Sequence, residues 1–137
     1  MKRTQESKVT ELLGKTLVGV KQAGSDDDDE IYFTCDDGSR YRMYHDQDCC
    51  ENVVIEDVCG DWDDLIGSPL LMAEEAVSEN QTPDGVTAPE YPDDSFTWTF
   101  YKFATVKGYV TVRWYGESNG YYSESVILER LAKGGER

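Results

Sequence analysis

Apolar and polar residues alternate along most of this chain, which is the period of β-strands that bury one face. The alternation is clearest in residues 30–35, where Ile31, Phe33 and Cys35 share one face, and it resumes in residues 40–45. An Asp-Gly pair between these segments supplies the positive backbone angle of a tight turn, so they are predicted to form a hairpin. Further strands are predicted at residues 16–23, 52–58, 69–76 and 121–131, the last being a strand or a strand that continues into a helix.

The longest predicted hairpin consists of residues 95–106 and 109–116, joined by a two-residue turn. This register places Lys102 directly opposite Arg113. Two like charges at directly opposite positions destabilise a sheet, so an anion is expected between them. That anion is either a neighbouring carboxylate or a bound ligand.

Two short helices complete the predicted elements, one in residues 1–14 and one at residues 61–66. The fold class is therefore α+β, a predominantly antiparallel sheet with two short helices in a single domain. Residues 78–94 contain several prolines and acids and are expected to form an exposed loop. The ends, residues 1–3 and 133–137, are expected to fray.

The charge of the chain is strongly uneven. The protein has 28 acidic and 13 basic residues, and its net charge is −15. Residues 26–100 hold 22 of the acids but only two bases, Arg40 and Arg42. Such a field repels nucleic acid and anionic membranes and attracts basic proteins, so neither a nucleic acid nor a membrane is an expected partner.

Candidate chemistry for catalysis or metal binding is sparse. The chain has one histidine, His45, and no phosphate loop, dinucleotide fingerprint or nucleophile elbow. Zinc could use His45, Cys49 or Cys50, and Cys59, but their spacing matches no strong zinc pattern. We therefore expect no catalytic residues, no metal and no cofactor.

The four cysteines are expected to be reduced thiols, because adjacent cysteines rarely pair with each other. The first residues are charged and lack the apolar stretch of a signal peptide, and no apolar run is long enough to span a membrane. The expected location is therefore the cytoplasm.

Arginines and aromatic residues gather in two segments, residues 40–44 and 113–123. Guanidinium groups grip phosphate in a bidentate manner and aromatic faces stack on bases, so these residue types suit a nucleotide-like ligand. The alternative is that the aromatic residues fill the core and the arginines pair with acids. The candidate ligand-binding residues are Arg40, Arg42, Tyr44, Phe100, Lys102, Arg113, Tyr115, Asn119 and Tyr121.

The same segments resemble a family of small uncharacterised proteins found in tailed phages and prophages. The similar motifs are residues 40–45, 47–51, 55–57, 60–61, 64–69, 98–101, 108–116 and 118–123. The resemblance covers roughly residues 12–130 and implies a viral setting in a host cytoplasm. It implies no activity, although small phage proteins of this kind often counter host defences.

Two functional hypotheses follow. The leading one is a non-enzymatic counter-defence protein that captures an anionic, nucleotide-like host signal, with exposed edge strands as a route to homo-oligomers. The alternative is an acidic mimic of nucleic acid that blocks a basic groove of a host defence protein, such as a nuclease or a CRISPR complex. The residues of that alternative are Asp26, Asp27, Asp28, Asp29, Glu30, Asp57, Asp61, Asp63 and Asp64.

Overall fold

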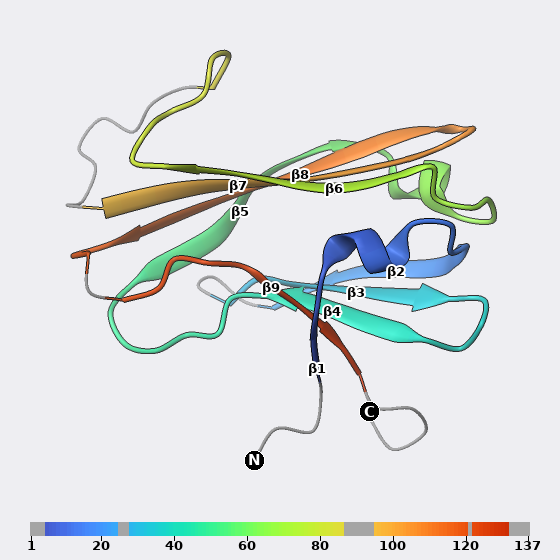
Figure 1. Ribbon diagram of the computed structural model, residues 1–137, viewed down its shortest axis with the longest axis horizontal. Coiled ribbons are helices and arrows are strands. Elements are labelled where there is room, and N and C mark those ends of the chain that lie inside the picture. The colour runs from blue at the N-terminus through green and yellow to red at the C-terminus, as the bar shows by residue number, and fades with distance from the viewer. Residues whose placement is uncertain (1–4, 25–27, 87–94, 121, 132–137) are drawn as a thin grey trace.

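Two antiparallel sheets pack against each other in this protein and bury apolar side chains of their strands between them (Figure 1). The computed structural model describes residues 5–24, 28–86, 95–120 and 122–131. Within them the fold is mostly antiparallel β-sheet in two layers, one of five strands and one of four.

The strands of each layer can be followed in Figure 1. The five-stranded sheet contains, in spatial order, β1 (Gln5–Ser7), β9 (Ile127–Arg130), β4 (Arg40–Tyr44), β3 (Glu30–Cys35) and β2 (Leu17–Ala23). The four-stranded sheet contains β5 (Asn52–Gly60), β8 (Gly108–Ser118), β7 (Ser95–Thr105) and β6 (Met72–Glu79). The predicted hairpin of residues 30–35 and 40–45 is confirmed as β3 and β4.

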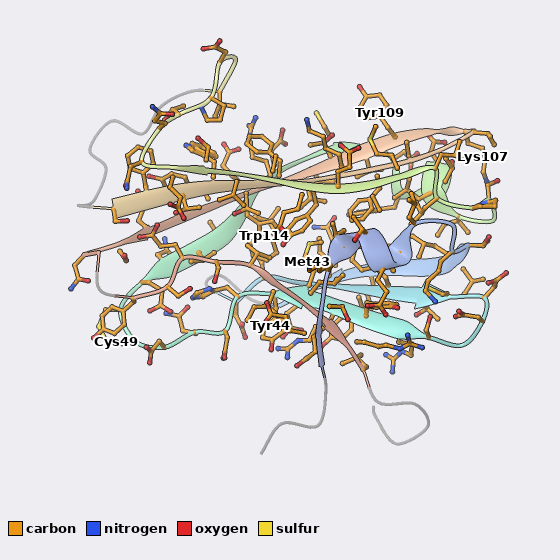
Figure 2. The ribbon with its side chains drawn as sticks, viewed as in Figure 1. Met43, Tyr44, Cys49, Lys107, Tyr109 and Trp114 are labelled. Carbon is orange, nitrogen blue, oxygen red and sulfur yellow. A yellow bond between two sulfur atoms is a disulfide. The ribbon has the colours of Figure 1, made fainter. Side chains whose placement is uncertain are left out.

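The core lies between the two layers. Figure 2 shows Met43 and Trp114 pointing into this space from opposite sheets, whereas Tyr44 and Tyr109 point away from it. Phe33 contacts Phe103 across the same space, with ring centroids 5.5 Å apart. Alternate residues of β3, β4 and β8 therefore have opposite surroundings, one set in the core and the other on an outer face.

The predicted helices are wrong. The described residues contain only two single 3-10 turns, η1 (Val9–Leu12) and η2 (Trp62–Leu65), so the fold is not α+β. In η1 the buried residues are Val9 and Leu12, three positions apart as a 3-10 turn requires, whereas Leu13 is exposed. No helix in the described part of the chain is long and apolar enough to cross a membrane.

The register predicted for the long hairpin is also wrong, by two residues. Thr105 pairs with Gly108, so the turn consists of residues 106–107. Contacts with η2 hold this register, because Thr105 donates its hydroxyl proton to the carbonyl of Asp64. A Cβ at Gly108 would lie 2.6 Å from a carboxylate oxygen of Asp64 and 3.1 Å from its Cβ, so a larger residue here would displace the Asp64 side chain.

Two other predictions need smaller corrections. The strand predicted at residues 69–76 is β6, three residues further along the chain. The segment predicted at residues 121–131 forms only the short strand β9. The fraying predicted for the ends and the later part of the loop, residues 87–94, lie outside the described residues.

Replacing Trp114 with alanine tests the position of the core. Trp114 is 1% exposed, so W114A should lower the free energy of unfolding by about 3–5 kcal/mol, measured by urea denaturation. Tyr109 is on the same strand and 65% exposed, so Y109A is the control and should change stability by less than about 1 kcal/mol. Equal losses in the two variants would contradict this assignment of the faces.

Candidate functional site

The predicted ligand-binding cations lie on opposite outer faces of the sandwich. Arg40 and Arg42 alternate with the buried Tyr41 and Met43 on β4, which places them on the outer face of the five-stranded sheet. Lys102 and Arg113 are on the outer face of the four-stranded sheet. Because the core separates these faces, the four cations cannot grip one small ligand.

Arg42 already has anionic and aromatic partners. It donates to Glu30 at 2.6 Å and lies 3.7 Å from a carboxylate oxygen of Glu129. Burial alone would lower the pKa of Arg42, but the hydrogen bond and charge of Glu30 raise it above its usual value. The guanidinium lies 3.6 Å from the ring centroid of Tyr44, and Tyr44 is buried, so this ring offers no open face to a base.

Arg113 is held in a similar way on the other outer face. Its Nε donates to Glu56 at 2.6 Å, and its Nη2 lies 3.7 Å from Asp57. Both acids are on β5, where a bulge between Ile55 and Asp57 shifts the register. Of the two expected anions, a neighbouring carboxylate is therefore present at Arg113.

Lys102 does not face Arg113, which corrects the predicted pairing. Lys102 lies opposite Thr111 on one side and opposite Glu74 on the other. Phe100, rather than Lys102, lies opposite Arg113. No pair of like charges is therefore at directly opposite positions on this hairpin.

The remaining ligand-binding candidates are dispersed. Phe100 and Lys102 line a hollow of about 450 Å³, which residues 83–86 help to enclose. Tyr115 packs on Trp98, with ring centroids 4.5 Å apart. Asn119 is exposed in the turn after β8, and Tyr121 is outside the described residues.

Several of the predicted acidic binding residues have structural roles. Asp29 accepts a hydrogen bond from the backbone N–H of Ile55, and Glu30 and Asp57 pair with the two arginines described above. Asp61 accepts from the N–H of Asp63 and caps η2. Of the remaining predicted acids, Asp28 and Asp63 are exposed, and Asp64 is half-buried beside Gly108. Asp26 and Asp27 are outside the described residues.

The sequence prediction missed an acidic rim on β6. Glu74, Glu75 and Glu79 are exposed on this edge strand. Glu75 and Glu79, together with Glu124, line a polar hollow of about 320 Å³ on the inner side of the rim. Part of the signal was present in the sequence, since the strand predicted at residues 69–76 contains Glu74 and Glu75, whereas Glu79 fell in the predicted loop.

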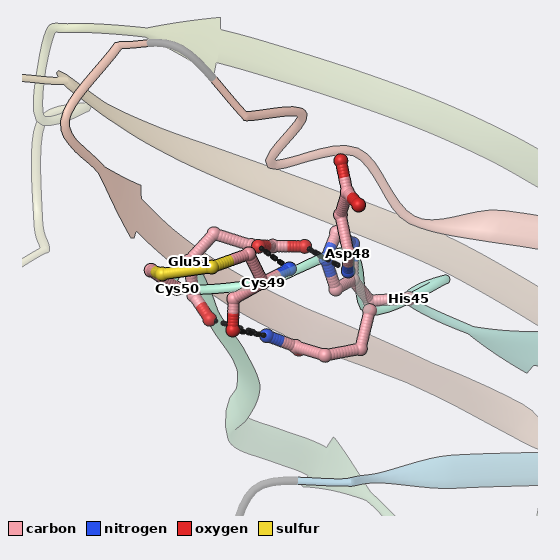
Figure 3. Close-up of a disulfide and its surroundings, with 6 residues drawn as sticks. His45, Asp48, Cys49, Cys50 and Glu51 are labelled. Atoms are coloured by element: carbon pink, nitrogen blue, oxygen red, sulfur yellow. Dashed lines mark hydrogen bonds and ion pairs between the residues drawn. A yellow bond between two sulfur atoms is a disulfide. The ribbon is translucent and has the colours of Figure 1, made fainter.

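A buried pair of His45 and Glu51 joins the two connections between the sheets (Figure 3). His45 Nε2 lies 2.7 Å from a carboxylate oxygen of Glu51, and Nδ1 lies 2.7 Å from the carbonyl oxygen of Ser125. Each ring nitrogen therefore faces an oxygen that can accept a hydrogen bond. The pair ties the β4–β5 connection to the segment that leads from β8 to β9.

The carboxylate of Glu51 also organises the turn that precedes it. It accepts hydrogen bonds from the backbone N–H groups of Asp48, at 2.8 Å, and Cys49, at 3.0 Å. Burial alone would raise the pKa of Glu51, but these donors and His45 lower it to about 2. The hydrogen bonds of this cluster hold the chain where it crosses between the sheets.

The cysteine prediction is partly wrong. Cys49 and Cys50 form a disulfide in this exposed turn, where the backbone brings the two adjacent side chains together (Figure 3). Cys35 and Cys59 are free thiols, and burial raises the pKa of Cys35. Among the described residues, no three His, Cys, Asp or Glu side chains are grouped so that they could hold a metal ion.

A comparison with protein families identifies the chain. Residues 10–128 match the family described as a domain of unknown function, DUF7448. The chain belongs to the DUF7448 family. The match includes every strand except β1 and the end of β9, so the matched region covers nearly the whole two-sheet fold. No curated protein and no solved structure matches the chain.

The pH dependence of stability tests the role of Glu51. Its pKa is lowered from 4.5 to about 2 by folding, so its stabilising contribution is complete above about pH 4.5 and is lost as the pH falls towards 2. E51Q should therefore lower the free energy of unfolding by about 3 kcal/mol at pH 7, and the difference from wild type should shrink below pH 4.5. Urea midpoints measured from pH 7 to pH 3 provide the comparison.

The control for this experiment is D46N, which removes an exposed carboxylate from the same connection. It should change stability by less than about 0.5 kcal/mol at any of these pH values. An E51Q variant whose midpoints run parallel to those of wild type at every pH would contradict the assignment.

Proposed function

We propose that this DUF7448 protein is a non-enzymatic binding protein whose acidic surface engages a basic surface of a partner protein. The observation that carries the proposal is the pairing of its cations. Lys15, Arg42, Arg113 and Arg130 each form an ion pair with a carboxylate, and two of these cations contact two carboxylates each. Because these four cations are neutralised by adjacent carboxylates, the net charge of −15 comes from other acids, many of which are exposed.

The proposed setting comes from the resemblance to phage proteins. In that setting the partner is a host defence protein with a basic groove for nucleic acid, such as a nuclease or a CRISPR complex. A surface that presents carboxylates where the groove expects phosphates competes with nucleic acid and requires no turnover. The pairing of the arginines is why this hypothesis now ranks above the capture of an anionic ligand.

Inhibition of DNA cleavage by a panel of bacterial defence nucleases and CRISPR complexes tests this proposal. Glu79 is exposed on the acidic rim of β6, so the charge reversal E79K should weaken inhibition of a susceptible enzyme by at least about ten-fold. Inhibition by the wild type should also weaken steeply with added salt, because surface charges are screened beyond about 8–10 Å near physiological ionic strength.

The control is E79D, which keeps the charge and should inhibit as the wild type does. An inhibitor that is insensitive both to salt and to E79K, or the absence of inhibition across the panel, would contradict the proposal.

A second candidate function is favoured by the hollow at Phe100. An aromatic face and the exposed ammonium group of Lys102 line the same hollow, and such a combination suits a nucleotide-like anion. This is the earlier ligand-capture hypothesis restricted to one face of the protein. It requires a small ligand and no basic partner.

A thermal-shift screen with cyclic dinucleotides, cyclic oligonucleotides and ADP-ribose derivatives tests this second candidate. A ligand present at about 100 times its dissociation constant should add about 2.7 kcal/mol of stability. The shift should disappear in K102A and persist in K21A, which removes an exposed lysine from the other sheet. A screen in which no nucleotide stabilises the protein would exclude capture of these ligands.

A further inference from the structure

The four-stranded sheet ends at β6, and no other described strand pairs with the outer edge of β6. β6 is eight residues long and pairs with β7 without a shift in register. The other sheet edges are less suited to pairing, because β2 and β5 contain bulges and β1 has only three residues. β6 is therefore the one long and regular edge among the described strands.

The hydrogen-bond pattern shows which groups of β6 point outward. The N–H of Asn80 donates to the carbonyl of Phe96 on β7. In an antiparallel pair, bonding to the neighbouring strand alternates from residue to residue. Glu75, Val77 and Glu79 therefore direct their backbone N–H and C=O groups towards the open edge.

A hollow lies on each side of this edge. The inner one, of about 320 Å³, is lined by Glu75, Val77 and Glu79 of the strand and by Glu124. The outer one, of about 450 Å³, is more apolar, and its lining includes Ala76, Pro83, Val86 and Phe100. Side chains of a strand alternate between two faces, so a strand added at this edge would direct one set into each hollow.

The beginning of β6 is less accessible than its end. η1 contacts β6, and the N–H of Gly14 donates to the carbonyl of Leu70 just before the strand. Val77, at the centre of the remaining length, is 53% exposed. The accessible edge is therefore the stretch from Glu75 to Glu79.

We propose that this stretch of β6 binds an extended, basic segment of the partner protein as an additional antiparallel or parallel strand. Main-chain hydrogen bonds to Glu75, Val77 and Glu79 would provide affinity. Lys or Arg side chains opposite these residues would enter the acidic inner hollow, and apolar side chains between them would cover the outer hollow. This inference rests on the proposed function, because it names the place and the form in which a basic partner binds.

The charge of β6 argues for a basic partner rather than a second copy of this chain. Glu74, Glu75 and Glu79 are exposed along the strand. Two copies paired edge to edge would bring six carboxylates into one short ladder, and like charges at opposite positions are destabilising. A basic segment meets the same carboxylates with complementary charge.

The test uses two synthetic peptides and two variants of Val77. One peptide alternates as Lys-Val-Lys-Thr-Lys-Val-Lys. The other carries backbone N-methyl groups on its central Lys-Thr-Lys, which keeps the charge but removes the N–H groups that an added strand of either orientation would donate to β6. V77P removes an outward N–H that β7 does not use, so edge position 77 should tolerate it. V77T keeps this N–H and a β-branched side chain and is the matched control.

Affinities are measured by isothermal titration calorimetry at low salt, after thermal melting has shown that each variant is folded. We expect the wild type and V77T to bind the alternating peptide alike and V77P to bind it at least ten-fold more weakly. The N-methylated peptide should bind the wild type at least ten-fold more weakly, and this comparison needs no altered protein.

Three outcomes would overturn the inference. Equal affinities for both peptides and both variants would be consistent with charge-driven binding but would exclude the β6 edge as the place where a strand is added. Binding of neither peptide, together with an inactive nuclease panel, would overturn the proposed function as well. A dimer in light scattering that V77P abolishes would assign the edge to a second copy of the chain.

Discussion

The packing of the two sheets against each other decides where the charged residues of this protein lie. Alternation sends one residue of each pair into the core around Trp114 and the next to an outer face. Polar residues on a strand therefore either pair with neighbours on that face or remain exposed at an edge. Arg42 and Arg113 pair with neighbours, because the adjacent strands carry acids beside them. The glutamates of β6 remain exposed at the edge of the sheet, and they form the acidic rim.

The sandwich depends on the places where the chain crosses from one sheet to the other. The β4–β5 connection leaves the five-stranded sheet, and the β8–β9 connection returns to it (Figure 1). The two meet at His45, which bonds to Glu51 in the first and to Ser125 in the second. Glu124 strengthens the same region by accepting from Thr97 and Ser118. The residue types of the cluster around His45 and Glu51 suggest catalysis or metal binding. In the structure, its hydrogen bonds link the two connections between the sheets.

Local pattern predicted much of the fold and little of the pairing. Strict alternation and an Asp-Gly turn were sufficient for β3 and β4. The register of β7 and β8 depends on the contacts of Thr105 and Gly108 with Asp64, more than 40 positions earlier, and no local pattern reports such contacts. The partners of Arg113 were hidden for the same reason, because a bulge in β5 sets their position. The sequence showed an acidic strand near β6. Only the structure shows that β6 is the last strand of its sheet, so that its outer edge is open.

These features together assign binding to one rim of the molecule, where an open strand edge and unneutralised carboxylates coincide. Amide hydrogen exchange of the protein with and without the alternating Lys-Val peptide tests this assignment most directly, because it reports on individual backbone N–H groups. The account predicts new protection at Glu75, Val77 and Glu79, with little change on β2 and β5. Protection confined to β2 or β5, or spread evenly over the acidic surface, would contradict it.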